Sequence, residues 1–416
     1  MRYKTWQLFI LVFIIVNNSS AQWTSLGLSG KSIYSIASIG DIIIVGTQNE
    51  GIYRTTNDGT TWSQVSDVDL KLTSVEALKI SGSMLIAGTN IFGRATYYSI
   101  DSGASWVPVN SIINDYTSAI VLKQDTILLG TLNSGVYRST DQGNTWLNVC
   151  PSDSTPKNVL SLLWSENTIY VGTHTNFGGV WKSSDLGDTW VMANSGLPKY
   201  PGNIWMDIPS LISYGQFIFA GSNGAGCYRS SDAGTHWDSV NSGLPQNAGV
   251  YSLSSNEETL YLGTYGVYQS TDYGNHWLSI SNNLPTGHPV MSLYISNGSI
   301  YAGIYGNGLW KLPLSSSDVK SNANNLYLDG FILNQNYPNP FNSSTTISFG
   351  IASKSQVTLK IYDLLGREVA SLINNETMSP GIHFQQWNAL NISSGIYFYR
   401  LQAGTFTESK KLILLR

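Results

Sequence analysis

Charged residues are scarce in this sequence: they make up 12% of 416 residues, about half the share found in ordinary soluble domains. Basic residues are the rarer kind, because 20 of them remain against 26 acidic residues once Arg2 and Lys4 near the start are set aside. No basic run in the propeller offers a surface for phosphates. We therefore expect no nucleic-acid partner.

Cysteine and histidine are also rare. Cys150 and Cys227 are the only cysteines and fall at different points of different repeats, so we expect both to be small buried residues without a disulfide. No histidine and cysteine cluster has metal-ligand spacing, and no Gly-x-Ser-x-Gly elbow or phosphate-cradling loop is present. The sequence predicts no metal site and no cofactor.

The N-terminal apolar run, from Leu8 to Val16, is too short to cross a bilayer. It follows Arg2 and Lys4 and precedes small residues that end at Ala21, which is the order of a secretory leader. We predict a signal peptide over residues 1–21, with cleavage between Ala21 and Gln22. No cysteine follows the run, so we expect neither a lipoprotein anchor nor a transmembrane segment in the mature chain.

Glycine and aromatic residues are plentiful, and many belong to one repeated pattern, seen in Ser139 to Trp146. Copies begin at Thr55, Ser99, Ser183, Ser230 and Ser270 and share Ser/Thr-x-Asp-x-Gly-x-x-Trp, here called the octet. The third residue is expected to be structural in every copy, because a short polar side chain accepts N–H groups of its own turn. These residues are Asn57, Asp101, Asp141, Asp185, Asp232 and Asp272.

The rest of the octet suits a tight hairpin. Gly143 is expected at positive φ, and each octet tryptophan begins the next strand, where it can attach its hairpin to the sheet behind it. The octet resembles the Asp-box, or bacterial neuraminidase repeat. Propellers of that kind include sialidases, the photosystem II assembly factor and the sortilin ectodomain, so the resemblance implies a propeller and assigns no binding residue.

The octet belongs to a longer unit of four short strand-like runs. The second run ends on a glycine that recurs at positions 46, 88, 130, 172, 221, 263 and 303, a period near 42 residues. Four strands per repeat at this period predict propeller blades, and seven glycines predict seven blades over residues 22–314. The last repeat has no octet and no fourth strand, so we expect residues 22–26 to supply that strand and close the ring.

Arg54, Arg138, Lys182, Arg229, Gln269 and Lys311 share one slot in the third strand, which is interpreted as a solvated face. Residues outside the repeat pattern are better ligand candidates, because irregular connections can vary without unfolding the ring. Those expected on the face opposite the octets are Tyr200, Trp205, Asp207, Tyr116, Phe92, Phe177, Tyr265 and Tyr305. For several of them, plugging the centre of the ring is the alternative role.

An enzyme is the weaker hypothesis. A sialidase needs three arginines around its substrate, and Arg94 is the one arginine of the propeller outside the pattern. Asp115 and Asp207 lie on equivalent connections and can be imagined as the acid and base of a glycosidase. We expect a binding propeller for a glycan or protein, with a glycoside hydrolase of the sialidase or xyloglucanase type as the alternative.

A polar linker is expected over residues 315–332, followed by a second domain over residues 333–416. Period-two alternation in Ile347/Phe349/Ile351 and Tyr397/Tyr399/Leu401 predicts a small Ig-like β-sandwich, so the whole chain is expected to be all-β. Asn336 to Asn342 (Asn-Tyr-Pro-Asn-Pro-Phe-Asn), residues 357–369, 395–401 and the end at 410–416 resemble the type A sorting domain of the type IX secretion system. One departure is Ser343, where that family usually has proline. The resemblance implies the secretion machinery as partner and a secreted or outer-surface location in a Gram-negative-type envelope.

Overall fold

The computed structural model describes residues 22–65, 69–81, 84–91, 94–109, 113, 115–152, 155–174, 178–314, 331–333, 336, 339–351, 353–378, 381–390 and 392–415. The predicted leader with Ala21, most of the predicted linker, and the ligand candidates Phe92 and Phe177 lie outside these residues. Every element of the described part is a strand. No helix in it is long and apolar enough to cross a membrane.

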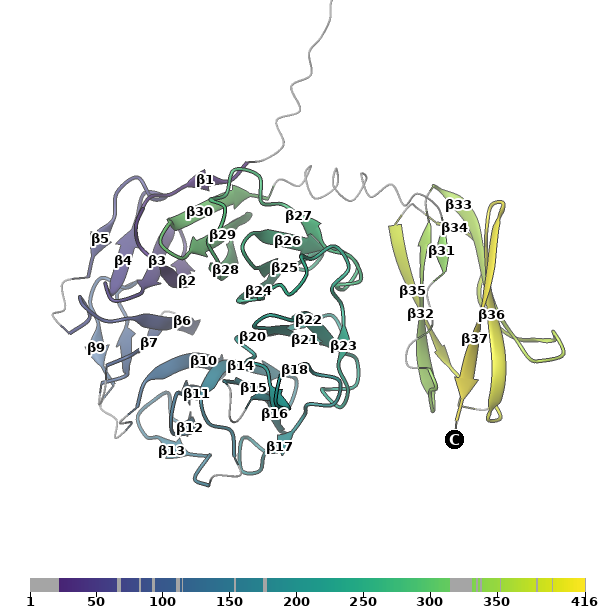
Figure 1. The fold of residues 1–416 in the computed structure, drawn as a ribbon, viewed down its shortest axis with the longest axis horizontal. Helices are drawn as coiled ribbons and strands as arrows, with labels where there is room; N and C mark the ends of the chain where they lie inside the picture. Colours follow the sequence, from purple (N-terminus) through teal and green to yellow (C-terminus); the bar gives the residue numbers. More distant parts are fainter. Residues whose placement is uncertain are drawn as a thin grey trace, which may run out of the picture.

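Seven four-stranded antiparallel sheets follow one another as blades around a ring (Figure 1). Blades 1 to 3 are β2(Ile33–Ile39), β3(Ile42–Thr47), β4(Ile52–Thr55), β5(Ser63–Gln64); β6(Val75–Ser81), β7(Met84–Thr89), β8(Thr96–Ser99), β9(Val107–Pro108); β10(Thr117–Lys123), β11(Thr126–Thr131), β12(Gly135–Ser139), β13(Leu147–Asn148). Blades 4 and 5 are β14(Val159–Ser165), β15(Thr168–Thr173), β16(Gly179–Ser183), β17(Val191–Met192); β20(Ser210–Tyr214), β21(Phe217–Ser222), β22(Gly226–Ser230), β23(Asp238–Ser239). Blades 6 and 7 are β24(Ser252–Ser255), β25(Leu260–Gly263), β26(Val267–Ser270), β27(Leu278–Ser279); β28(Val290–Ser296), β29(Ser299–Ile304), β30(Gly308–Pro313) with β1(Thr24–Ser25).

The N-terminal strand completes the last blade, as predicted. Thr24 pairs with Lys311 and Ser25 with Trp310, so β1 occupies the outer place of the β28-β29-β30 sheet. Trp23 is buried beside Leu312 in the core of this blade, and its Nε1 donates a hydrogen bond of 2.6 Å to the carbonyl oxygen of Ile280 in blade 6. The two ends of the propeller chain are thus joined in one sheet.

The recurring glycine lies where neighbouring blades approach most closely. A Cβ at Gly46 would stand 2.6 Å from the carbonyl oxygen of Val75 in the next blade, and a Cβ at Gly303 would stand 2.8 Å from the Cβ of Ile33. Beside the first of these contacts, Ser35 Oγ donates a hydrogen bond of 2.9 Å to the Val75 carbonyl. Glycine therefore recurs once in each blade because a side chain at this position would prevent the next blade from packing so closely.

The octets form the hairpins between the third and fourth strands. In the octet of Asp141, the Oδ1 atom accepts hydrogen bonds from Ser139 Oγ at 2.7 Å and from the N–H of Thr145 at 2.9 Å. These hydrogen bonds, led by that of the Thr145 hydroxyl, lower the pKa of Asp141 to about 2. Gln142 and Gly143 both have positive φ, at 58° and 91°. The carboxylate is fully occupied by its own turn, as a structural role requires.

Five tryptophans each attach their own hairpin or outer strand to the preceding blade. Each donates its indole N–H to a carbonyl at the end of the preceding outer strand: Trp23 to Ile280, Trp62 to Leu26, Trp190 to Val149, Trp237 to Ala193 and Trp277 to Val240. Trp106 and Trp146 differ, because they donate to Gly103 and Gly143 in their own hairpins. At Trp106 and Trp146, therefore, the indole N–H does not form the expected hydrogen bond to the preceding blade.

The third-strand cations were wrongly interpreted as a solvated face. They are half-buried and reach the hairpin of the next blade, where a backbone carbonyl accepts the hydrogen bond of each except Lys311, which donates to the carboxylate of Asp58. Arg138 Nη1 donates to Leu186 at 2.7 Å, Lys182 Nζ to Ala233 at 2.9 Å and Arg229 Nη1 to Tyr273 at 2.7 Å. A side chain long enough to bridge two blades, with a charged head that strengthens the bond, explains the preference for Arg and Lys.

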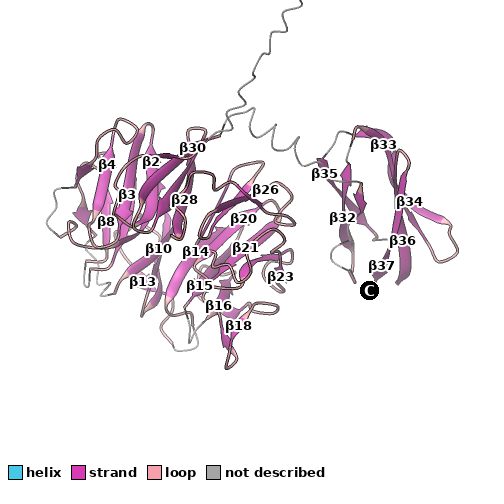
Figure 2. Ribbon diagram, turned by 45° about the horizontal axis from the view of Figure 1, so that its top comes forward, coloured by secondary structure: helices cyan, strands magenta, loops and turns pink. Residues whose placement is uncertain are grey.

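The C-terminal residues form two sheets over a common core, the predicted sandwich (Figure 2). One sheet contains β31(Ile332–Leu333), β32(Ser344–Ile351) and β35(Gly381–Asn388); the other contains β34(Glu368–Met378), β33(Ser355–Tyr362), β36(Gly395–Ala403) and β37(Phe406–Leu414). Phe349 of the first sheet and Leu359 and Tyr399 of the second belong to the same fully buried cluster. β31 begins one residue before the expected boundary at 333.

Candidate binding site at the centre of the propeller face

Strand direction places two kinds of loop on opposite faces of the propeller. The octets share one face with the hairpins between first and second strands. The loops between second and third strands and the links between blades share the other, here called the connection face. The innermost strands, β2, β6, β10, β14, β20, β24 and β28, surround the ring axis (Figure 1).

Each innermost strand begins on the connection face with a half-exposed residue between two buried ones. In blade 1 the pairing with β3 skips from Ile33 to Ser35, which leaves Tyr34 as a bulge, and blades 2, 3, 4 and 7 skip in the same way. Because the flanking side chains pack between blades, the residue in this slot is turned toward the ring axis. The seven are Tyr34, Glu76, Ser118, Leu160, Pro209, Tyr251 and Met291. Ser118 differs from the others because its hydroxyl donates a hydrogen bond to the carbonyl oxygen of Val159 in blade 4.

Glu76 is the one charged residue in this slot. Burial raises its pKa from the ordinary 4.5 to about 7, and no hydrogen bond or ion pair joins it to the described residues. The pKa of Tyr34 rises to about 12, mainly by burial and then through neighbouring Glu76 and Tyr305. Tyr34 is thus a neighbour of both Glu76 and Tyr305. Tyr305 comes from the loop between β29 and β30 and is 42% exposed.

A second group of tyrosines comes from blade 6 and the link before blade 5. The rings of Tyr251 and Tyr265 meet edge to face with centroids 6.1 Å apart, and Tyr265 is 57% exposed. Burial raises the pKa of Tyr251 to about 12, with smaller effects of Tyr265 and Tyr200. Tyr200 donates its hydroxyl hydrogen to the carbonyl oxygen of Asn223 at 3.1 Å. The structure thus brings three of the predicted tyrosines, Tyr200, Tyr265 and Tyr305, toward the axis.

The other predicted residues of the long link are more enclosed. The link contains a small hairpin, β18(Lys199–Tyr200) and β19(Ile204–Trp205). Trp205 packs against the core of blades 4 and 5, and Lys199 Nζ lies 3.9 Å from the centroid of its ring. Asp207 is 6% exposed, with its Oδ2 3.6 Å from His174 Nε2 and 3.5 Å from Asn223 Nδ2. Asp207 therefore orders the link more than it presents a free carboxylate.

Asp115 is a structural residue, which corrects its pairing with Asp207 as acid and base. It is 1% exposed and accepts hydrogen bonds from the N–H groups of Tyr116, Asn133 and Ser134 and from Asn133 Nδ2. These bonds outweigh its burial and lower its pKa. Tyr116 is half-buried beside it and lies on the connection face.

Glu76, Tyr34 and Tyr251 were missed by reasoning from the sequence. Only an alignment of the blades at this slot reveals them, because Ile33-Tyr34-Ser35, Val75-Glu76-Ala77 and Val250-Tyr251-Ser252 share one pattern. Within the described residues, no group of three or more histidine, cysteine or acidic side chains forms a metal site. The arrangement offers aromatic surface and the carboxyl group of Glu76, which has no partner in the part of the chain that the structure describes.

Comparison with known families identifies the C-terminal domain. Residues 335–415 match the family described as the secretion system C-terminal sorting domain. The last domain is a secretion sorting domain. Domains of this kind direct export through the type IX secretion system, so the chain is a cell-surface or secreted protein. No curated protein sequence matches the chain significantly.

Solved structures resemble the propeller at low sequence identity. YCF48 bound to a D1 peptide is 14% identical, with a TM-score of 0.55 over 71% of this chain and 98% of that one. PorZ, a surface component of the type IX secretion system of Porphyromonas gingivalis, is 14% identical, with a TM-score of 0.51 over 92% of this chain and 59% of that one. The GH74 enzyme of Niastella koreensis is 14% identical, with a TM-score of 0.55 over 95% of this chain and 75% of that one. These likenesses show the fold alone.

Proposed function

We propose that this protein is a non-catalytic binding propeller that holds a glycan or protein ligand at the centre of its connection face. The observation that carries the proposal is the set of tyrosines on the connection face, with Glu76 in the axial slot of blade 2. Tyr34, Tyr305, Tyr251, Tyr265 and Tyr200 come from four different parts of the ring and supply aromatic surface at low entropic cost. YCF48, a protein of similar fold, binds a D1 peptide.

Glu76 narrows the class of ligand. The half-buried carboxylate of Glu76 loses hydration and gains no ion pair from the described residues. A cationic group of a ligand would supply that ion pair. A lysine or arginine side chain, or the ammonium group of an amino sugar, meets this requirement, and neighbouring tyrosine faces add cation–π attraction. We favour ligands that carry such a group.

A glycoside hydrolase is the second candidate, and Glu76 is the observation in its favour. A carboxyl group with pKa near 7 suits a general acid. Retaining and inverting mechanisms both need a second carboxylate within about 5–10 Å of the first. The two acids named for that role from the sequence are engaged in the frame of the connection face, which favours binding over hydrolysis.

Glycan and peptide arrays probed with the mature chain test the proposal. Replacement of Tyr305 by alanine, or of Glu76 by glutamine, is expected to weaken binding of the array ligand at least tenfold. Leu278→Ala, an exposed change on the outer strand of blade 6, is the control and should leave affinity unchanged. The proposal fails if no array component binds, or if the control weakens binding as much as Tyr305→Ala does. Release of reducing sugar that Glu76→Gln abolishes would establish the hydrolase instead.

A further inference from the structure

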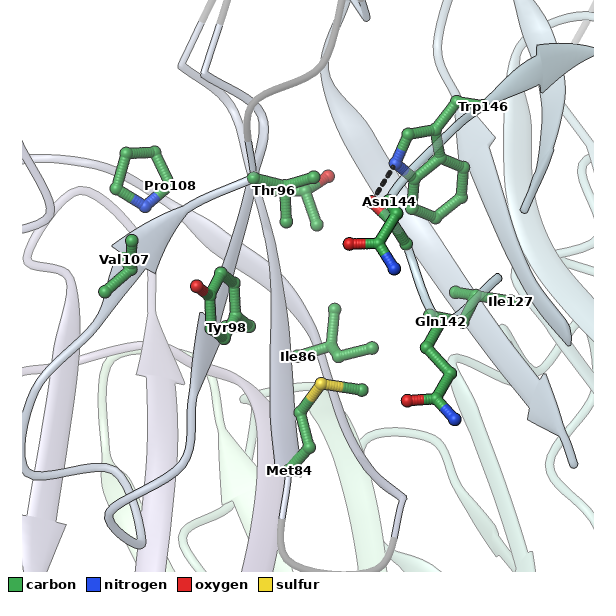
Figure 3. Close-up of a pocket in the computed structure, with 12 residues that line it drawn as sticks. Met84, Ile86, Thr96, Tyr98, Val107, Pro108, Ile127, Gln142, Asn144 and Trp146 are labelled. Atoms are coloured by element: carbon green, nitrogen blue, oxygen red, sulfur yellow. Dashed lines mark hydrogen bonds between the residues drawn. The ribbon is translucent and has the colours of Figure 1, made fainter. Parts of the chain in front are cut away.

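A pocket opens between blades 2 and 3, away from the site just described. Its volume is about 410 Å³, within the range of small-molecule sites. One wall comes from the face of blade 2, with Met84, Ile86 and Tyr98, and the other from the octet hairpin of blade 3, with Gln142, Asn144 and Trp146 (Figure 3).

The pocket exists because the bridging side chain of the repeat is missing here. In blades 3, 4 and 5 the third-strand cation crosses to the next hairpin and donates to its backbone carbonyl. Blade 2 carries Tyr98 in this slot, and a tyrosine cannot donate to the carbonyl of Gln142 in the way that Arg138 donates to that of Leu186. The space that an Arg or Lys side chain would cross is left open.

Trp146 leaves the same space open from the other side. Its equivalents Trp190, Trp237 and Trp277 reach back to the preceding blade, where a carbonyl accepts the indole N–H. Trp146 instead bonds to Gly143 of its own hairpin at 3.0 Å, which Figure 3 shows as the dashed line, and its ring stays half-exposed at the pocket. Val109, the residue equivalent to Val149, lines the pocket instead of receiving the indole.

The chemistry of the lining is uncharged and amphipathic. Ile86, Val109 and the Trp146 ring provide apolar surface. The side-chain amide of Gln142 donates a hydrogen bond to the carboxylate of Asp125, and that of Asn144 donates to the carbonyl oxygen of Asp141. The amide oxygens of both side chains remain as acceptors at the rim of the pocket. A ligand for such a pocket is neutral, presents C–H groups to an aromatic face and donates hydroxyl hydrogens.

From this geometry we propose that the pocket binds one unit of a neutral carbohydrate. The apolar face of the sugar ring lies on Trp146, and its hydroxyl groups donate to the side-chain oxygens of Gln142 and Asn144. The two departures from the repeat, Tyr98 and the turned Trp146, are what make room for it. This site is separate from the connection face, so the full chain would hold two different ligands or two parts of one glycan.

Titration of the mature chain with cellobiose, maltose and lactose, followed by calorimetry and by saturation-transfer NMR, tests the inference. We expect at least one of these disaccharides to bind saturably. Asn144→Ala should weaken that binding at least tenfold, and Asn275→Ala, at the same hairpin position in blade 6, should not. Asn275 is a matched control because its side-chain oxygen already accepts from Arg229 at 3.1 Å.

Tyr98→Arg provides a second variant that keeps the fold, since arginine occupies this slot in blades 1, 3 and 5. We expect it to bridge to the hairpin, fill the pocket and abolish disaccharide binding while the melting temperature is kept or raised. Absence of saturable binding by all three disaccharides would overturn the inference. Binding that survives both Asn144→Ala and Tyr98→Arg but is lost in Tyr305→Ala would also overturn it, and would assign the sugar to the connection face.

Discussion

Glu76 should make the propeller less stable at neutral and alkaline pH than a glutamine at the same place. The carboxyl group stands half-buried with no ion pair among the described residues, and burial raises its pKa from 4.5 to about 7. At 1.36 kcal/mol per pKa unit, charging this group in the folded protein costs about 3 kcal/mol more than in the unfolded chain. This is an upper value, because part of the side chain still meets solvent.

The sign follows from where the proton is held. Between pH 4.5 and 7 the folded protein keeps the proton that the unfolded chain has lost, so stability falls as pH rises through this window and stays lower above it. Glutamine has nearly the same shape and no charge. Glu76→Gln should therefore match the original protein near pH 4 and exceed its stability at pH 8 by up to about 3 kcal/mol.

Urea unfolding at pH 4 and pH 8 measures the difference. Tryptophan fluorescence reports on the propeller, because all tryptophans except Trp6 and Trp387 lie within it. Glu257→Gln, in the exposed hairpin between β24 and β25, is the control and should give equal stability to the original protein at both pH values. If Glu76→Gln is no more stable at pH 8, or if its advantage is the same at pH 4, Glu76 is not the desolvated acid described here.

Three further predictions concern the frame. Trp23→Ala should cost about 3–5 kcal/mol in urea unfolding, since it removes a buried ring that joins the chain's two ends, and a loss below about 1 kcal/mol would show that this junction does not hold the propeller. Trp237→Ala should cost a similar amount, whereas Trp146→Ala should cost roughly half as much because its ring is half-exposed and bonded within its own hairpin; equal losses would contradict the distinction. Deletion of residues 333–416 should leave a folded propeller in the periplasm, as judged by cell fractionation and circular dichroism, and export of the shortened chain would contradict the sorting role.

The frame was predictable because it repeats. Seven copies of one glycine and six of one octet gave the number of blades and the place of each hairpin, and a missing strand after Leu312 pointed to the N-terminus. Repetition averages out the weak signal of any single short strand. The same logic does not extend to how blades touch, which is why the slot of Arg54 and Arg138 was assigned to solvent when those side chains in fact bridge blades.

The candidate site was predicted only in part, for a physical reason. Tyr200, Tyr265 and Tyr305 stand out in the sequence because they fall in irregular segments. Glu76 falls within a regular strand, and whether such a residue faces a neighbouring blade or the axis depends on a bulge that shifts the alternation by one. The role suggested for Asp115 was wrong for the opposite reason. Asp115 lies in an irregular segment, but its carboxylate is the buried acceptor for N–H groups of the neighbouring loop.

Glu76 and Tyr98 share one property: each occupies a slot that other blades use differently, and neither forms the contact that the slot provides elsewhere. Four of the seven axial slots hold residues without a charge or a hydroxyphenyl ring, and the bridging slot holds a cation in five blades. A residue that forgoes a bridge, or keeps an unpaired acid half-buried, lowers stability without improving the fold. Such departures persist most readily where a ligand occupies the open space or pairs with the free carboxyl group. We therefore place ligands at Glu76 and at the pocket beside Tyr98. The octets are poorer candidates, because their carboxylates already accept hydrogen bonds from their own turns.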